Sequence, residues 1–128
     1  MLGVAYCQSW SILTRNSSME TVLSIGLDPE LLKLRQAVLE YAGFRVHIAH
    51  NEAEAVREIQ KGDCGVLLIC YSLDVEVRRR VTEMFRTKCP NGRVVSISNS
   101  EPDKPFFGDV IIYGLEGPEA LIEAVRGK

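Results

Sequence analysis

Residues 65–70 form the unbroken apolar run Gly65-Val66-Leu67-Leu68-Ile69-Cys70 near the middle of a 128-residue chain. A strand with one exposed face would alternate apolar and polar residues, and this run does not alternate. A strand of this kind is covered on both faces, which is typical of the centre of a parallel sheet. The run therefore predicts a buried central strand with helices packed on both sides of it.

Short β-branched runs alternate with amphipathic helical stretches on either side of this strand. We predict further strands at residues 21–25, 44–49, 93–98 and 109–113. Residues 44–49 alternate apolar and polar side chains, which indicates an edge strand with one exposed face. The repeated strand–helix order predicts an α/β domain with helices on both faces of a parallel sheet.

The clearest helix signals follow the first strand. Asp28 stands at an N-cap position ahead of Pro29, a residue favoured at the first position of a helix. Leu31, Leu34, Val38 and Tyr41 then fall on one face at helical spacing. Gly43 provides the C-terminal stop. These signals predict a helix from about residue 29 to residue 42.

Two more helices are expected before the fourth strand. Asn51 to Glu54 forms a capping-box-like opening for a helix that runs to Gly62. Ser72 is the predicted cap of the next helix, with Asp74 inside its first turn. The side chains of that helix predicted to face inward are Val77, Val81, Met84 and Phe85.

The interval between the fourth and fifth strands breaks this rhythm. Residues 99–108 contain Pro102, Pro105 and Gly108, which leave room for at most one helical turn. We therefore expect the fourth crossover helix to be missing or shortened, with a tight irregular connection or a displaced fifth strand.

The bulk composition restricts the functional classes. The net charge of −2 offers no overall basic field for nucleic acid or an anionic membrane. No apolar run approaches the ~20 residues needed to span a bilayer. The four cysteines contain no CxxC pair, which favours reduced thiols in a cytoplasmic protein and gives no reason to expect a metal site. We assign residues 1–19 to an N-terminal extension without a predicted function and residues 20–128 to one domain.

Residues 22–126 resemble the response-regulator receiver family of two-component signalling. The similar stretches are Val22–Leu32, Tyr41–Val46, Ala49–Ala55, Gly65–Cys70 and Pro118–Leu121. The resemblance implies a flavodoxin-like three-layer fold with a five-stranded parallel sheet in the order 2-1-3-4-5. It also implies a functional site at the carboxyl ends of the strands.

The resemblance places the phosphoryl-transfer positions on side chains that are mostly unsuitable. Receivers hold Mg²⁺ with two acidic residues after the first strand, and those positions fall here on Gly26 and Leu27. The phosphoacceptor aspartate position falls on Cys70, and the lysine position falls near Gly114. Ser98 is compatible with the Ser/Thr position. Because phosphoryl transfer depends on metal and cation neutralisation of charge, we expect no phosphorylation of this chain.

Asp28 and Cys70 each have two interpretations. Asp28 either caps the first helix or holds a weak Mg²⁺, and we favour the cap because a single carboxylate rarely suffices for this cation. Cys70 is either an inert, space-filling thiol or a redox-reactive one. We favour the inert thiol because its expected neighbours include no cation to lower its pKa.

Two groups of residues are candidates for partner contact. Arg78 and Arg79 belong to a basic patch on the third helix, although Glu76–Arg80 and Arg79–Glu83 have the spacing of i,i+4 ion pairs. The adjacent aromatics Phe106 and Phe107 either contact a partner or fill the space of the missing helix.

We interpret the chain as a phosphorylation-independent pseudo-receiver that is not an enzyme and needs no cofactor. Its expected partner is a protein: a signalling kinase, a regulator, or a second copy in a homodimer. Nucleic acid and membrane are not expected partners. The alternative is a small-molecule-binding or Cys70-based redox-sensing domain on the same fold.

Overall fold

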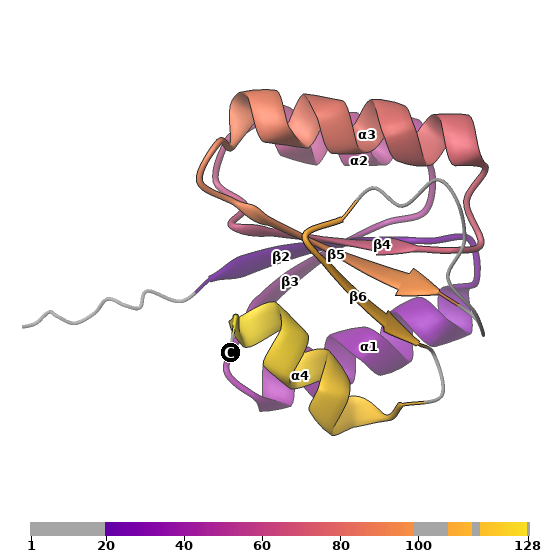
Figure 1. Cartoon of the computed structure of the whole chain (residues 1–128), viewed down its shortest axis with the longest axis vertical. Helices are drawn as coiled ribbons and strands as arrows, with labels where there is room; N and C mark the ends of the chain where they lie inside the picture. The colour runs from indigo at the N-terminus through magenta and orange to yellow at the C-terminus, as the bar shows by residue number, and fades with distance from the viewer. Residues whose placement is uncertain (1–19, 99–107, 114–115, 128) are drawn as a thin grey trace, which may run out of the picture.

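Strands and helices alternate along the chain as the sequence predicts. The computed structural model describes residues 20–98, 108–113 and 116–127, and Figure 1 shows how their elements are arranged. The strands are β2 (Thr21–Ile25), β3 (Arg45–Ala49), β4 (Val66–Cys70), β5 (Arg93–Ser98) and β6 (Val110–Tyr113). The helices are α1 (Pro29–Tyr41), α2 (Glu52–Gln60), α3 (Val75–Lys88) and α4 (Pro118–Arg126).

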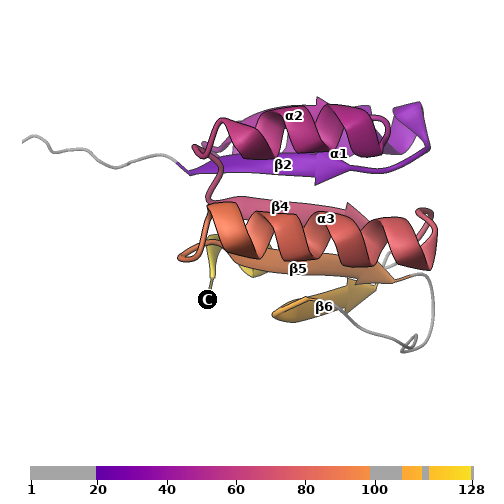
Figure 2. The same ribbon diagram turned by 90° about the horizontal axis from the view of Figure 1, so that it is seen from above.

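The five strands form one parallel sheet in the order β3-β2-β4-β5-β6, which confirms the predicted flavodoxin-like order. The arrowheads in Figure 2 accordingly point the same way. β4 lies at the centre, and all five of its residues are buried, as the apolar run at residues 65–70 predicts. β3 lies at one edge, as its alternation predicts.

The sheet separates two hydrophobic clusters. α2 and α3 cover one face, and α1 and α4 cover the other (Figure 1). Along β4, Leu67 and Ile69 point into the α2/α3 cluster, whereas Val66 and Leu68 point into the α1/α4 cluster. This alternation follows from the pleat of the strand, and it explains why a central strand must be apolar throughout.

Polar side chains fix the starts of the first three helices. The Asp28 carboxylate accepts a hydrogen bond from the Glu30 backbone N–H at 3.0 Å, which confirms the predicted cap. Asn51 caps α2 by accepting from the backbone N–H of Glu54 at 2.9 Å. Our placement of the third helix start was wrong, because Asp74, and not Ser72, is the N-cap of α3. The Ser72 hydroxyl is used elsewhere, in a hydrogen bond described below.

The apolar face predicted for α1 is not the face that α1 buries. Leu32 and Leu39 are the buried residues of the helix. On the predicted face, Leu34 is 59% exposed and Tyr41 is 93% exposed. α1 therefore has apolar side chains in two directions, and the sheet covers only one of them.

The β5–β6 region agrees with part of the prediction. β6 pairs in parallel with β5, so the fifth strand is not displaced. Among the described residues, no helix lies between these two strands, and the connection itself, residues 99–107, lies outside the described part of the chain. Asp109 fixes the start of β6 through its carboxylate, which accepts from the Val94 backbone N–H at 2.8 Å.

Two further expectations concern membrane spans and the N-terminal extension. No helix within the described ranges is long and apolar enough to cross a membrane. The N-terminal extension, residues 1–19, lies outside the described residues, so its assignment stays a prediction.

Candidate functional site

The structure brings most of the predicted site positions to one edge of the sheet. Gly26 follows β2 directly, Cys70 ends β4 and Ser98 ends β5. The Tyr71 backbone N–H donates to the Ile97 carbonyl at 2.9 Å, so the ends of β4 and β5 are held side by side. Gly114 lies outside the described residues. Gly26, Cys70 and Ser98 therefore lie at the carboxyl ends of three neighbouring strands.

Gly26 and Cys70 are in close contact. A Cβ atom placed on Gly26 would lie 3.3 Å from the Cβ of Cys70 and 3.5 Å from Cδ2 of Leu32. Cys70 itself is only 2% exposed, and Leu32 is fully covered by the core. Apolar atoms therefore occupy the space between the ends of β2 and β4, and a carboxylate at position 26 would enter a crowded, poorly solvated site.

The loop after β2 is tied to the loop after β4. The Leu27 backbone N–H donates to Oγ of Ser72 at 3.3 Å, while the Leu27 side chain is 57% exposed. Leu27 thus offers a main-chain group to the site but no side-chain oxygen. Ser72 was missed as a site residue because its partner is 45 residues away in the sequence, a separation that local capping patterns do not reveal.

Two carboxylates of the described residues near this edge, Asp28 and Asp74, are used as helix caps. Asp28 accepts from the backbone N–H groups of Glu30 and Leu31, at 3.0 and 3.5 Å. Asp74 accepts from the backbone N–H of Glu76 at 3.3 Å. Within the described part of the chain, no group of three or more His, Cys, Asp or Glu side chains is placed to hold a metal ion. The two aspartates therefore stabilise helix starts, as N-cap residues typically do.

The described cysteines are free and buried. Cys64 and Cys89 belong to the α2/α3 cluster at the opposite end of the strands from Cys70. Burial raises the pKa of the Cys64 thiol to about 12, and burial also raises the pKa of Cys89. These two thiols are therefore protonated at neutral pH, and a protonated thiol is a poor nucleophile.

The basic patch on α3 is largely neutralised by neighbouring carboxylates. Arg79 pairs with Glu76 at 2.7 Å and with Glu83 at 3.3 Å, which includes the predicted i,i+4 pair. The hydrogen bond from Arg79 lowers the pKa of Glu76 below its usual value. The predicted Glu76–Arg80 pair was wrong, because Arg80 turns toward α2 and pairs with Glu52 at 2.8 Å.

The other candidate contact residues are either partly buried or outside the described part of the chain. Arg78 is partly buried, and its Nε atom has no hydrogen-bond partner among the described residues. Phe106 and Phe107 lie outside the described part of the chain. Partner contact through Arg78, Arg79, Phe106 or Phe107 stays a prediction.

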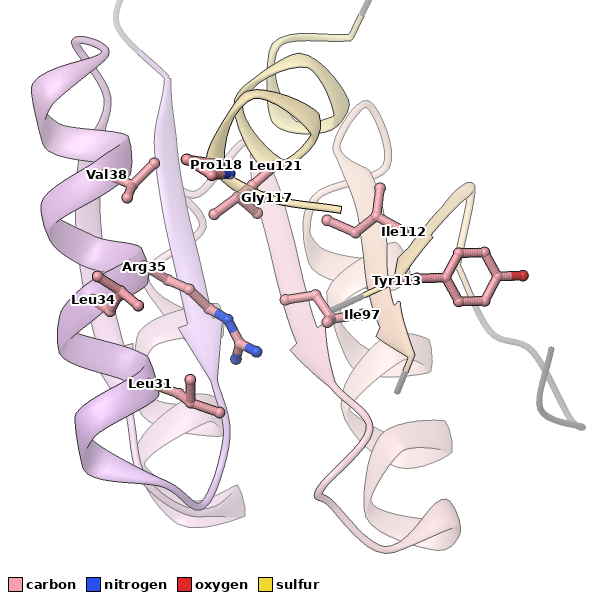
Figure 3. Close-up of a pocket in the computed structure, with 10 residues that line it drawn as sticks. All are labelled: Leu31, Leu34, Arg35, Val38, Ile97, Ile112, Tyr113, Gly117, Pro118 and Leu121. Carbon is pink, nitrogen blue, oxygen red and sulfur yellow. The ribbon is translucent and has the colours of Figure 1, made fainter. Parts of the chain in front are cut away.

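An apolar groove between α1 and α4 was not anticipated from the sequence. It has a volume of about 300 Å³, and Figure 3 shows side chains from both helices and from two strands around it. Its lining residues are Leu31, Leu34, Arg35, Val38, Ile97, Ile112, Tyr113, Gly117, Pro118 and Leu121. The spacing of Leu31, Leu34 and Val38 was a signal for it, but spacing alone does not tell whether an apolar helix face is covered.

Several solved structures that superpose on this chain are receiver domains. Chemotaxis protein CheY4 of Vibrio cholerae superposes with a TM-score of 0.73 and 17% identity, covering 85% of this chain and 98% of that one. A response regulator receiver protein of Sinorhizobium medicae gives a TM-score of 0.69 and 22% identity, covering 86% and 94%. Response regulator TrrA of Thermotoga maritima, solved in complex with Mg²⁺ and BeF, gives 0.73 and 17%, covering 84% and 97%.

The sequence itself matches no protein-family model, and no curated protein matches it. The chain therefore has the receiver fold over most of its length, with low sequence identity to these three receivers.

Proposed function

We propose that this chain is a receiver-like signalling domain that acts by contact with a protein and does not require phosphorylation. The fold supports the signalling assignment, since the superposed structures are chemotaxis and response-regulator receivers. The contact between Gly26 and Cys70 supports the second part of the proposal, because a side chain at position 26 would meet the Cβ of Cys70 and the side chain of Leu32.

Phosphoryl transfer to an aspartate needs a nucleophile, a cation and donors to the phosphoryl oxygens. At the positions that the resemblance assigns, Cys70 replaces the nucleophile, and Gly26 and Leu27 replace the metal ligands. Mg²⁺ prefers oxygen ligands, and the nearby Asp28 carboxylate already accepts two backbone hydrogen bonds. At the Ser/Thr position, Ser98 supplies a hydroxyl to the site, but a hydroxyl does not neutralise the charge of a phosphoryl group.

A domain with this site would regulate through its surface and not through a reaction. We therefore propose that it is not an enzyme, and that its partner is a signalling kinase, a regulator or a second copy of the chain. The net charge of −2 gives no support for a nucleic-acid partner.

Intact-mass spectrometry after incubation with Mg²⁺ and a small-molecule phosphodonor tests the proposal. We expect the mass to be unchanged, while a receiver with the full set of acidic residues, treated in the same tube, gains one phosphoryl group. The Cys70→Asp variant is the matched control, because it restores a carboxylate nucleophile without the metal ligands. We expect this variant to remain unmodified as well. A phosphoryl gain on the unaltered chain would overturn the proposal.

The alternative of redox sensing at Cys70 requires a thiol that reagents can reach. Because Cys70 is 2% exposed, its alkylation requires local opening of the fold, so we expect it to be roughly tenfold or more slower than in the unfolded chain. Labelling with iodoacetamide at pH 8, located by peptide mass spectrometry, measures this ratio. Equal labelling of Cys70 in the folded and unfolded chain would favour the redox alternative.

A further inference from the structure

α1 has an apolar stripe beside its buried face. In this stripe Leu34 and Tyr41 are exposed, and Leu31 and Val38 are half-buried. Leu31, Leu34, Val38 and Tyr41 are separated by 3, 4 and 3 residues, which is the spacing of a and d positions in a heptad. Leu34 and Tyr41 are two of the three most exposed large apolar side chains described, at 59% and 93%. The stripe is thus suited to packing against another helix.

The groove beside α1 widens this apolar surface. Leu31, Leu34 and Val38 form one wall of it, and Pro118 and Leu121 of α4 form the opposite wall (Figure 3). The stripe and the groove are therefore one continuous surface built from two helices. A contiguous apolar surface of this kind on a folded domain usually marks a contact site.

Charged residues flank the stripe in a self-complementary pattern. With Leu31 at position a and Leu34 at d, Glu30 falls at g and Arg35 falls at e. In a parallel pair of helices, the g residue of one helix faces the e residue of the next heptad in the other. Arg35 follows Glu30 by five residues, which is the spacing from position g to position e of the next heptad. Neither side chain has an ion-pair partner among the described residues.

We propose that this surface binds a second copy of the chain, with the two α1 helices parallel about a two-fold axis. Each α1 would then form two Glu30–Arg35 pairs with its partner, one in each direction. An antiparallel pair centred on Leu34 would instead place Arg35 opposite its own copy, which is unfavourable. α1 is already folded against the sheet, so pairing does not require a helix to be nucleated.

This inference rests on the proposed function, because it names the partner for a domain that acts by protein contact. The two can fail separately. Phosphoryl gain on a chain that dimerises would overturn only the proposed function, whereas a monomeric chain that gains no phosphoryl group would overturn only the inference.

Sedimentation equilibrium on the full chain, without Mg²⁺, measures the association. We expect a reversible dimer whose dissociation constant rises about tenfold or more in Leu34→Lys, since the change places a charge at the centre of the stripe. Gln60→Lys is the matched control, because it adds the same charge to an exposed position of α2, on the opposite face of the sheet. We expect it to leave the constant unchanged. A monomeric wild-type chain at millimolar concentration, or equal weakening by both changes, would overturn the inference.

Charge exchange tests the parallel orientation. Glu30→Arg and Arg35→Glu should each weaken the homodimer, because each places like charges across both contacts. An equimolar mixture of the two variants should regain wild-type association, since every contact then joins opposite charges. Circular dichroism on each variant checks that α1 remains folded. Variants that are folded but fail to recover when mixed would overturn the proposed pairing.

Discussion

The two faces of the sheet are built alike in the core and differently at the surface. On one face, Arg80 of α3 makes two 2.8 Å hydrogen bonds to Glu52 of α2. Arg86 of α3 also pairs with Asp109 at the start of β6, at 3.2 Å. On the other face, no ion pair joins α1 and α4 in the described part of the chain, and an apolar groove of about 300 Å³ opens beside their contact.

This difference shows how one fold can present a charged surface on one side and an apolar surface on the other. Arg80 and Glu52 pair across the α2/α3 face, and the residues around this pair are mostly charged or polar. α1 and α4 leave apolar side chains beside Arg35, which has no ion pair with a described residue, and burying these apolar side chains would be favourable. The carboxyl edge of the sheet lies between these two surfaces. There, apolar atoms of Cys70 and Leu32 lie close to Gly26.

The largest expected effect compares core truncations on the two faces. Ile59→Ala removes a fully buried side chain of the α2/α3 cluster, and we expect a loss of about 4 kcal/mol in the free energy of unfolding. Leu121→Ala removes a side chain that already borders the groove, and we expect about 2 kcal/mol because fewer contacts are lost. Urea denaturation measures both. A larger loss for Leu121→Ala would show that the α1/α4 face is closed in solution.

The next effect concerns Asp109. Burial opposes ionisation, but hydrogen bonds from the Val94 N–H and Arg86 outweigh it and hold the pKa of Asp109 below its usual value. The ionised carboxylate therefore stabilises the fold above the pKa of the unfolded chain, and this contribution is lost as the pH falls through the lowered pKa. We expect Asp109→Asn to cost about 1 kcal/mol at pH 7, discounted for partial exposure.

The difference in stability between Asp109→Asn and the wild type should disappear once the pH falls below the lowered pKa of Asp109. Thermal unfolding at a series of pH values measures this difference. Glu123→Gln is the control, because Glu123 is exposed on α4 and has no ion pair with a described residue. A pH-independent loss for Asp109→Asn would contradict the role of its charge.

A smaller effect on stability is expected for the Arg80–Glu52 ion pair, which joins α3 to α2. The hydrogen bond from Arg80 lowers the pKa of Glu52. Both side chains are partly exposed, so we expect a coupling of about 0.5 kcal/mol in a double-mutant cycle of Glu52→Gln and Arg80→Gln. The coupling should vanish in ~1 M salt, where charges are screened within about 3 Å. A coupling that survives this salt would indicate a contribution other than charge.

The smallest effect on stability is expected for a substitution in the apolar stripe of α1. At concentrations low enough to keep the chain monomeric, Leu34→Lys should change the free energy of unfolding by no more than about 0.5 kcal/mol. Leu39→Lys, five residues further along α1 and fully buried, should prevent folding. Circular dichroism on the two variants makes the comparison. Strong destabilisation by Leu34→Lys would mean that the chain itself covers the stripe.

The sequence was informative wherever a pattern depends on neighbouring residues. The apolar run at residues 65–70 predicted the central strand, and Asp28 and Pro29 predicted the start of α1. The order of the sheet came from the receiver resemblance, and the structure confirms it. The strand ends also place Gly26, Leu27, Cys70 and Ser98 at one edge, as the resemblance implied.

The errors arose where a distant part of the chain decides the outcome. The cap of α3 was misplaced because Ser72 is used by Leu27, across the sheet edge. Arg80 was assigned to Glu76 on its own helix, although the better partner is Glu52 on α2. The spacing of Leu31 and Leu34 could not tell that Leu32 and Leu39 occupy the core side of α1, because that choice depends on the sheet beneath the helix.

The most direct test of the central claim is a Mg²⁺ titration followed by amide NMR. The claim is that the carboxyl edge between β2 and β4 is filled and has no cage of carboxylates for a divalent cation. We predict no saturable shift of the amide signals of Gly26, Leu27 and Cys70 up to millimolar Mg²⁺. Saturable shifts confined to these three amides would show a working metal site and contradict the account.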